Sequence, residues 1–267
     1  MDALRLYGRY TAASIRGQMR YPASFLMTSF GAFLATAADA VGLWVLFAHF
    51  HHIHGWGFGE IAVFYGTVGT AFALTDAATR GFDVFGDFFV RTGAFDRLLL
   101  RPRTTVLQLL GHELRLSRIG RLAQAVLMLL IGLSLVHLQW SPRAAILLLA
   151  AVAGGMALFA GLLILQATLA FWTVESLEIA NILTYGGVQA AEYPLDVYAA
   201  WFRNFLIFVV PIGCIAYFPV VGALGRHDPL GAPDWVLFAS PAAGFAFLGV
   251  ALWVWGFGVR HYASTGS

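Results

Sequence analysis

The chain has 267 residues, of which 60% are hydrophobic and 11% are charged, and its formal net charge is +2. Soluble domains carry about 25% charged residues, so this composition excludes a water-soluble globular protein and predicts an all-α integral membrane protein. No lysine is present, which excludes a P-loop and Schiff-base chemistry on this chain. The single cysteine, Cys214, excludes an intrachain disulfide.

Residues 2–21 carry a stripe of arginines instead of an apolar block. Four arginines, spaced by four, seven and four residues, fall on one narrow face of a helix with tyrosines roughly opposite: Arg5, Arg9, Arg16 and Arg20. We expect an N-terminal helix that lies in the membrane interface, with the arginines toward lipid phosphates. A plain basic tail ahead of the first span is the other interpretation.

Six apolar stretches are long enough to cross a bilayer at about 1.5 Å per residue. The first resembles a cleaved signal peptide in its charge order, but its apolar character resumes further on, so we expect a retained helix. Pro211 and Pro219 break the fifth stretch. The chain then forms one membrane domain, 1–267, with spans over about 22–48, 59–79, 118–138, 144–172, 204–222 and 236–259.

The first span and the loop after it contain polar residues. Asp39 lies inside the span, where a carboxylate costs roughly 3 kcal/mol unless it faces protein or water. It is therefore a candidate for a substrate path, although a packing hydrogen bond or a position near the outer interface would also explain it. Four histidines follow within His49–His54, but no cysteine or carboxylate accompanies them before Glu60. We expect a solvated loop there and no metal site.

Small residues in the second span predict a close contact with another helix. Gly66 and Gly69 each begin a pair of small residues at four-residue spacing. At the charged end of this span, Asp76 and Arg80 are one helical turn apart, and we expect them to pair.

Half of the arginines lie in one stretch, residues 80–121. If the N-terminus is inside, fourteen arginines fall on inner segments and two, Arg143 and Arg226, on outer loops. This bias places both termini and the arginine-rich stretch in the cytoplasm. Within it, Gly93–Pro102 begins with a turn signal and ends at a proline, which predicts a short amphipathic helix on the membrane face. Insertion into a cytoplasmic partner and binding to anionic lipid both fit such a helix.

Three ordered blocks carry a further pattern: GAFDRLLLRP at 93–102, FW at 171–172 through EYPLDVY at 192–198, and FVVP at 208–211 through AYFP to GR at 225–226. Together they resemble the type-2 ABC exporter permeases, in the subgroup with six spans and no fused ATPase. The resemblance covers essentially the whole chain.

The resemblance implies that residues 93–103 form a coupling helix seated in a cleft of a separate soluble ABC ATPase. The N-terminal stripe would be an elbow helix on the inner leaflet, and the segment after Pro211 would be partly re-entrant near the outer face. Two permeases, identical or sisters, would enclose a path that ATP-driven closure switches from inward to outward opening. ATP and Mg²⁺ would be bound by the partner ATPase, and this chain would hold no cofactor.

On this resemblance the chain is the permease subunit of an exporter for an amphipathic or drug-like substrate, in the bacterial cytoplasmic membrane. We expect no catalytic residue, no metal site and no nucleic-acid partner; membrane lipid surrounds the chain. Glu192 and Asp196 are further candidates for the inner surface, with a solvated loop or pairing to Arg203 as other interpretations. The expected ATPase-coupling residues are Phe95, Asp96, Arg97, Leu98 and Arg101.

Two other classes of protein share six spans. A secondary transporter or channel would use an ionisable group at mid-membrane, for which Asp39 is the one clear candidate, but the sequence shows no inverted repeat. A membrane-embedded enzyme would need acidic residues and histidines converging on the spans, whereas the histidines cluster in one loop. The sequence does not identify the substrate, nor does it distinguish identical permeases from sister permeases.

Overall fold

Helices make up most of the described part of the chain and strands almost none, so the all-α prediction is confirmed. The computed structural model describes residues 2–113, 115, 118–136, 141–173 and 177–263. The two strands of this part, β1 (His52–Ile53) and β2 (Trp56–Gly57), pair as an antiparallel hairpin. The helices are α1 (Asp2–Gln18), α2 (Pro22–Phe50), α3 (Phe58–Ala78), α4 (Arg80–Asp83), η1 (Phe85–Val90), α5 (Ala94–Leu99), α6 (Thr105–Leu110), α7 (Ile119–Leu135), α8 (Pro142–Leu169), α9 (Leu177–Ala191), η4 (Leu195–Val197), α10 (Ala200–Asn204), η5 (Phe205–Val209), α11 (Ile212–Ile215), α12 (Tyr217–Ala223), α13 (Asp234–Ala239) and α14 (Ala242–His261).

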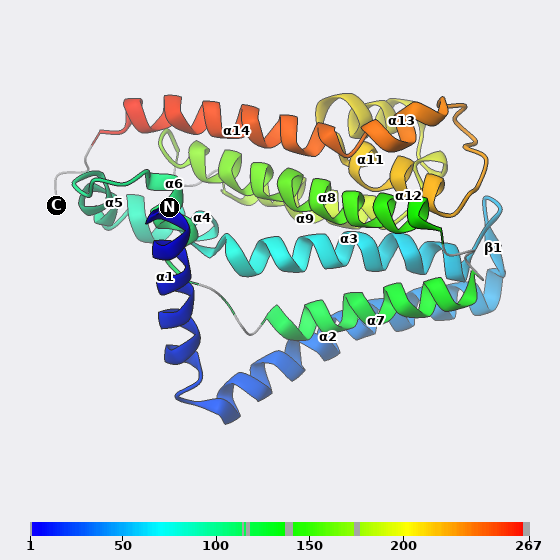
Figure 1. Cartoon of the computed structure of the whole chain (residues 1–267), viewed down its shortest axis with the longest axis horizontal. Coiled ribbons are helices and arrows are strands. Elements are labelled where there is room, and N and C mark those ends of the chain that lie inside the picture. The colour runs from blue at the N-terminus through cyan, green and yellow to red at the C-terminus, as the bar shows by residue number, and fades with distance from the viewer. Residues whose placement is uncertain (1, 114, 116–117, 137–140, 174–176, 264–267) are drawn as a thin grey trace.

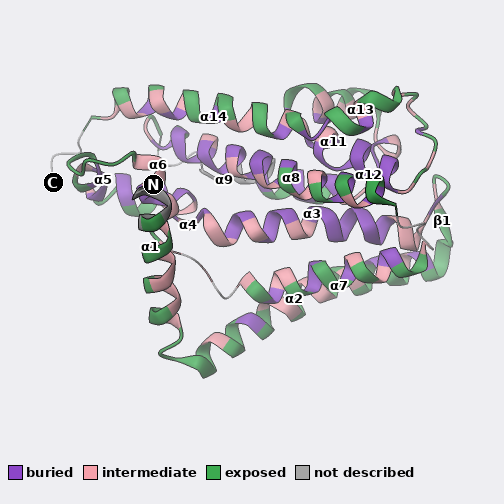
Figure 2. Ribbon diagram, viewed as in Figure 1, coloured by how far each residue is buried: buried purple, intermediate pink, exposed green. Residues whose placement is uncertain are grey.

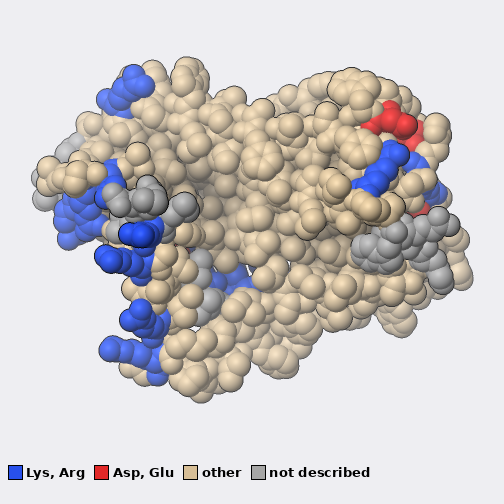
Figure 3. All heavy atoms as spheres, in the orientation of Figure 1, with Lys and Arg blue, Asp and Glu red and all other residues tan. Residues whose placement is uncertain are grey.

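The long helices run side by side along the longest axis of the molecule (Figure 1). Helix α3 contacts α7, α8 and α9, and α8 contacts α14. One end of this bundle carries α4, α5, α6 and the last turn of α14, with α1 crossing it at a steep angle; we call it the arginine-rich end. The opposite end carries β1, β2 and α10 to α13, and we call it the hairpin end. Basic side chains follow α1 and gather at the arginine-rich end, while a smaller group of charges lies at the hairpin end (Figure 3).

Four of the described helices, α2, α3, α8 and α14, are long and apolar enough to cross a membrane. A bent pair made from α10 to α12 adds a fifth if it is counted as one span, and α7 is apolar but shorter. A polytopic membrane protein follows, and the number of six spans stays a prediction.

The stretch predicted as a fifth span, 204–222, is bent, as the expected break at Pro211 requires. The helices Ala200–Phe208 and Ile212–Ala223 meet at an angle of 71°. The bend falls at Pro211, whose ring excludes a regular helix. Pro219 breaks nothing, because it lies in the first turn of α12, where backbone N–H groups have no partner within the helix.

Residues 173–203, which lie between the fourth and fifth predicted spans, contain the helix α9, which runs along the bundle (Figure 1). Before it, Phe171 packs on Phe95 at the arginine-rich end, with ring centroids 5.6 Å apart. After it, Asp196 accepts a hydrogen bond of 3.0 Å from the indole of Trp56 in the hairpin. Between these anchors α9 contacts α3 and α8, so this segment links the two ends.

The course of α9 also moves Arg203 to the hairpin end. Arg143 and Arg226 lie at the same end, where the Arg143 guanidinium sits 4.6 Å from the ring centroid of Phe238 in α13. The other arginines precede α8 or belong to the last turn of α14. The basic bias toward the arginine-rich end therefore remains, with three arginines opposite it instead of two.

Close backbone contact joins α3 to α7, as the small residues predict. A Cβ added at Gly66 would lie 2.4 Å from the backbone nitrogen of Leu129, and one at Gly69 would lie 2.9 Å from the Cβ of Ala125. Most of α3 is buried as a result, whereas α2 is largely exposed (Figure 2).

The expected pair of Asp76 and Arg80 is wrong. Thr79 interrupts the helix, and Arg80 pairs with Asp83 in the short helix α4 instead. Asp76 is 3% exposed and pairs with two arginines at the start of α7, Arg118 at 2.8 Å and Arg121 at 3.4 Å. A buried carboxylate needs such partners, and the neighbouring helix supplies them.

Candidate functional site

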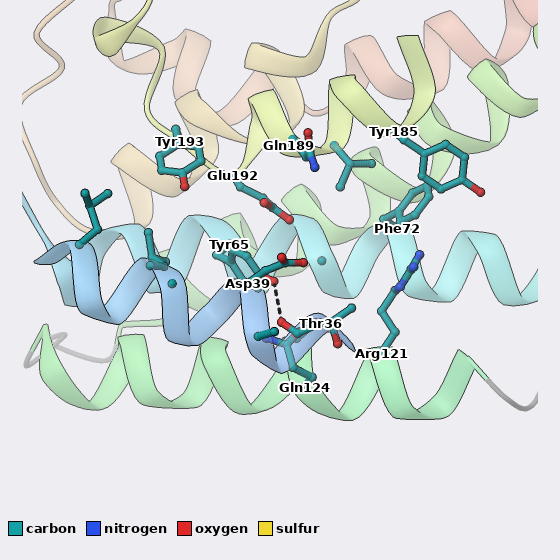
Figure 4. A pocket seen from close by; sticks show the side chains of 17 residues that line it. Thr36, Asp39, Tyr65, Phe72, Arg121, Gln124, Tyr185, Gln189, Glu192 and Tyr193 are labelled. Carbon is teal, nitrogen blue, oxygen red and sulfur yellow. Dashed lines mark hydrogen bonds between the residues drawn. The ribbon is translucent and has the colours of Figure 1, made fainter. Parts of the chain in front are cut away.

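A cavity of about 550 Å³ opens between α2, α3, α7 and α9 (Figure 4). All four helices and the residue after α9 contribute polar side chains to the lining. These side chains include Thr36, Asp39, Tyr65, Arg121, Gln124, Gln189 and Glu192.

Two carboxylates point into this cavity from different helices. Asp39 projects from the middle of α2, and Glu192 follows the last turn of α9 on the facing side (Figure 4). Neither carboxylate makes a hydrogen bond or ion pair with another residue of the described chain. The structure thus places Asp39 in the lining of this cavity, and its role in a substrate path stays a prediction. The expectation that Glu192 lies on the inner surface is wrong, because α9 carries it into the cavity.

Arg121 closes the part of the cavity nearest the arginine-rich end. Its guanidinium lies 3.4 Å from the Asp76 carboxylate and 5.7 Å from the ring centroid of Phe72. The one basic residue in the lining is therefore already paired with a carboxylate outside the lining.

Two further polar residues of the lining lie on α3 and α7. Tyr65 donates a hydrogen bond of 3.4 Å to the backbone carbonyl of Thr36, which joins α3 to α2. Gln124 is 3% exposed, and its buried amide lies close to the Tyr65 side chain.

A second candidate surface is the tip around α5. The helix begins after Gly93, whose φ of 67° makes the turn that the sequence predicts, so the short helix is confirmed. Arg97 and Arg101 are exposed, and Leu100 between them is 85% exposed. The Gln108 side chain donates to the carbonyls of Leu98 and Arg103, each at 3.0 Å, and fixes the end of this turn.

The inner side of α5 is packed into the chain itself. Phe95 is 0% exposed and meets the rings of Phe85 and Tyr262, each with centroids 5.0 Å apart. Leu98 is buried as well. Burial and the neighbouring Asp96 carboxylate raise the pKa of Tyr262. Of the five expected coupling residues, Phe95 and Leu98 are therefore covered by their own chain, whereas Arg97 and Arg101 are exposed.

A cluster of charged residues and Trp56 connects the hairpin to the neighbouring segments at the hairpin end. Arg226 pairs with Glu60 at 2.7 Å, donates to the carbonyl of Gly55 at 2.7 Å, and lies 4.2 Å from the ring centroid of Trp56. The bond from Trp56 to Asp196 belongs to this cluster. Asp196 is therefore not on the inner surface where we expected it, since it lies at the opposite end from α5.

A family model described as ABC-2 family transporter protein matches residues 33–266. The chain belongs to this family. The match confirms the resemblance carried by the three sequence blocks, and it covers all four helices around the cavity as well as α5. No curated protein and no solved structure matches the chain.

An ABC-2 permease is a transmembrane subunit without its own ATPase domain and generally works with an ABC ATPase partner. In this ABC-2 transporter the sequence identified Asp39 and the α5 region, but it gave no role to Tyr65, Gln124 or Gln189. The only signal for them is a polar residue within an apolar stretch. Their common cavity depends on how four helices assemble, which spacing along one helix does not reveal.

Proposed function

We propose that this ABC-2 permease is the transmembrane subunit of an ATP-driven exporter, with both termini and α5 on the cytoplasmic side of a bacterial cytoplasmic membrane. The family supports a permease, and the absence of lysine supports a chain that depends on another subunit for ATP and Mg²⁺. The arginines concentrated at one end support the orientation.

The shape of α5 is the observation that carries this proposal. Its outer side exposes Arg97, Leu100 and Arg101, while its inner side is locked into an aromatic cluster. That cluster includes Phe171 after α8 and Trp255 of α14, with centroids 5.6 Å and 6.3 Å from Phe95. A push on the exposed tip therefore reaches two long helices through rigid contacts, as coupling to an ATPase requires.

The cavity supports a translocation path for an amphipathic substrate. Exposed polar groups on α2 and α9, such as Asp39 and Gln189, are costly against lipid but acceptable against water or another protein. A second permease, identical or a sister, would cover this open side and complete the path. The exposed face of α2 is the surface that such a partner would contact.

The test is co-purification in detergent with the soluble ATPase encoded beside this gene, followed by ATP hydrolysis and transport. We expect Arg97→Glu/Arg101→Glu to uncouple hydrolysis from transport without unfolding the membrane domain, because both side chains are exposed. Arg260→Glu is the matched control, since Arg260 is exposed at the same end but lies outside α5. Unchanged transport in the double variant would remove the coupling role of α5. Failure to bind any soluble ATPase would overturn the exporter and favour a carrier that uses Asp39.

A further inference from the structure

The charge of the central cavity is unbalanced. Two carboxylates, Asp39 and Glu192, face the same space, and the only basic side chain in the lining is Arg121. Arg121 is paired with Asp76 and lies to one side of both carboxylates (Figure 4). Its charge also acts on Glu192, but no basic residue of the described chain forms an ion pair with either carboxylate.

Ionising two unpaired carboxyl groups in one cavity is costly. An ionised side chain within a span, as at Asp39, costs roughly 3 kcal/mol in the absence of a partner, and two negative charges that face the same space repel each other. A positive charge placed between them would favour the ionised form of both. An anion in the same position would have the opposite effect, and Arg121, already paired with Asp76, would offset it only in part.

The rest of the lining fits an organic cation better than a bare ion. Four aromatic rings face the cavity: Tyr65, Phe72, Tyr185 and Tyr193. Aromatic faces attract cations within about 6 Å, and Phe72 already shows this contact with the Arg121 guanidinium. The same rings offer apolar area to the body of a ligand.

The size of the cavity and the amide of Gln189 also point to a small molecule. A volume of about 550 Å³ lies within the range of about 300–1,000 Å³ for small-molecule sites. Gln189 is exposed and lines the cavity, so a carbonyl or ether oxygen on the ligand would find a hydrogen-bond donor in its amide. A hydrated metal ion would need none of these features.

We propose that this cavity binds hydrophobic organic cations, with the positive centre between Asp39 and Glu192 and the apolar body against the aromatic rings. The conclusion that such cations are the exported substrate rests on the proposed function. The conclusion that the cavity binds them does not depend on export.

The test compares two probes of the same shape and opposite charge, tetraphenylphosphonium and tetraphenylborate. Equilibrium binding is measured with the full chain in nanodiscs, and binding to empty nanodiscs is subtracted. We expect the phosphonium to bind at least about tenfold more tightly than the borate, and Asp39→Asn/Glu192→Gln to weaken phosphonium binding by at least about tenfold. Equal binding of the two probes would overturn the proposal.

Two control variants separate charge in the cavity from folding. Asp234→Asn removes an exposed carboxylate outside the cavity, at the hairpin end, and should leave phosphonium binding unchanged. Glu192→Asp keeps the charge and should retain most of the binding. An equal loss in Asp234→Asn and in the cavity double variant would contradict a specific site. Tryptophan fluorescence on heating shows whether each variant is folded.

The same probes distinguish this proposal from the proposed function. Carboxylate-dependent phosphonium binding by a chain that joins no ATPase would support the cation site and overturn the exporter. An assembled complex whose ATP hydrolysis responds equally to both probes would support the exporter and overturn the cation site.

Discussion

Helices α2 and α3 are similar in composition and opposite in environment. The mean hydropathy of α2 is 1.7 and that of α3 is 1.3, yet 17% of the α2 span is buried against 78% of the α3 span. The less apolar helix is the one inside the protein. Hydropathy alone does not order the helices by burial, since α8 has a mean hydropathy of 2.4 and 61% of its span is buried. The small residues of α3 are what accompany its close contact with other helices.

The neighbours of each helix explain the difference. Helix α3 is surrounded by α7, α8 and α9, and its glycines let α7 approach to backbone contact. Helix α2 packs mainly on α7. Its remaining surface carries exposed rings such as Phe30 and Trp44, together with Asp39. One helix builds the core, and the other borders both the lipid and the cavity.

Removing a carboxylate should give the largest difference in stability between a variant of α3 and a variant of α2. Asp76→Asn in α3 leaves Arg118 and Arg121 without their buried counter-charge, so we expect a loss of roughly 3 kcal/mol of stability. Asp39→Asn in α2 removes an exposed carboxylate without a partner in the described chain, so we expect no loss of stability and a gain of up to about 3 kcal/mol. Thermal unfolding of both variants in detergent measures the difference, and equal losses would contradict the comparison.

Adding one methyl group should have the next largest effect. Gly66→Ala places a Cβ where the backbone of Leu129 already lies, so α3 and α7 must move apart. We expect this variant to lose about 1–3 kcal/mol of stability. Gly31→Ala in α2 meets nothing within 4 Å, and we expect it to be neutral or slightly stabilising. The unfolding temperatures of the two variants measure this difference. An unchanged unfolding temperature for Gly66→Ala would show that the helices do not touch there.

A smaller effect is expected where α2 and α3 meet through the hairpin. Arg226→Lys keeps the charge but loses the guanidinium group, whose two nitrogens donate to Glu60 and to the Gly55 carbonyl at the same time. We expect a loss of about 1 kcal/mol of stability. Arg203→Lys is the matched control, because Arg203 makes no ion pair with the described residues. If both substitutions have the same effect on the unfolding temperature, the Arg226 cluster does not hold the hairpin.

The elements that the sequence predicts well are those with a local signal. The turn at Gly93 and the following Arg-Pro bound α5, and the spacing of Gly66 and Gly69 predicts a packing face; the structure confirms both features. The sequence predicts that the apolar side of α5 contacts the partner ATPase, whereas in the structure this side packs against the rest of the chain. An amphipathic pattern shows that a side is covered, but it does not show what covers it.

The sequence does not predict helices that carry polar residues because they lie inside the bundle. Helix α9 carries Glu178 and Asn181 in its sequence, which lowers its hydropathy and makes it resemble a loop. The bond from Trp56 to Asp196 joins residues 140 positions apart, and no spacing rule reaches that far. Glu192 follows the same course, so its place in the cavity depends on finding α9 first.

The central claim is that the exposed tip of α5 binds an ATPase, and photo-cross-linking in cells tests it most directly. Benzoylphenylalanine is placed at Leu100 on the tip and, as a control, at Trp235, which is 68% exposed at the hairpin end. The account predicts a covalent adduct with a P-loop ATPase from position 100 and none from position 235. Adducts with lipid alone at position 100, or an ATPase adduct from position 235, would contradict it.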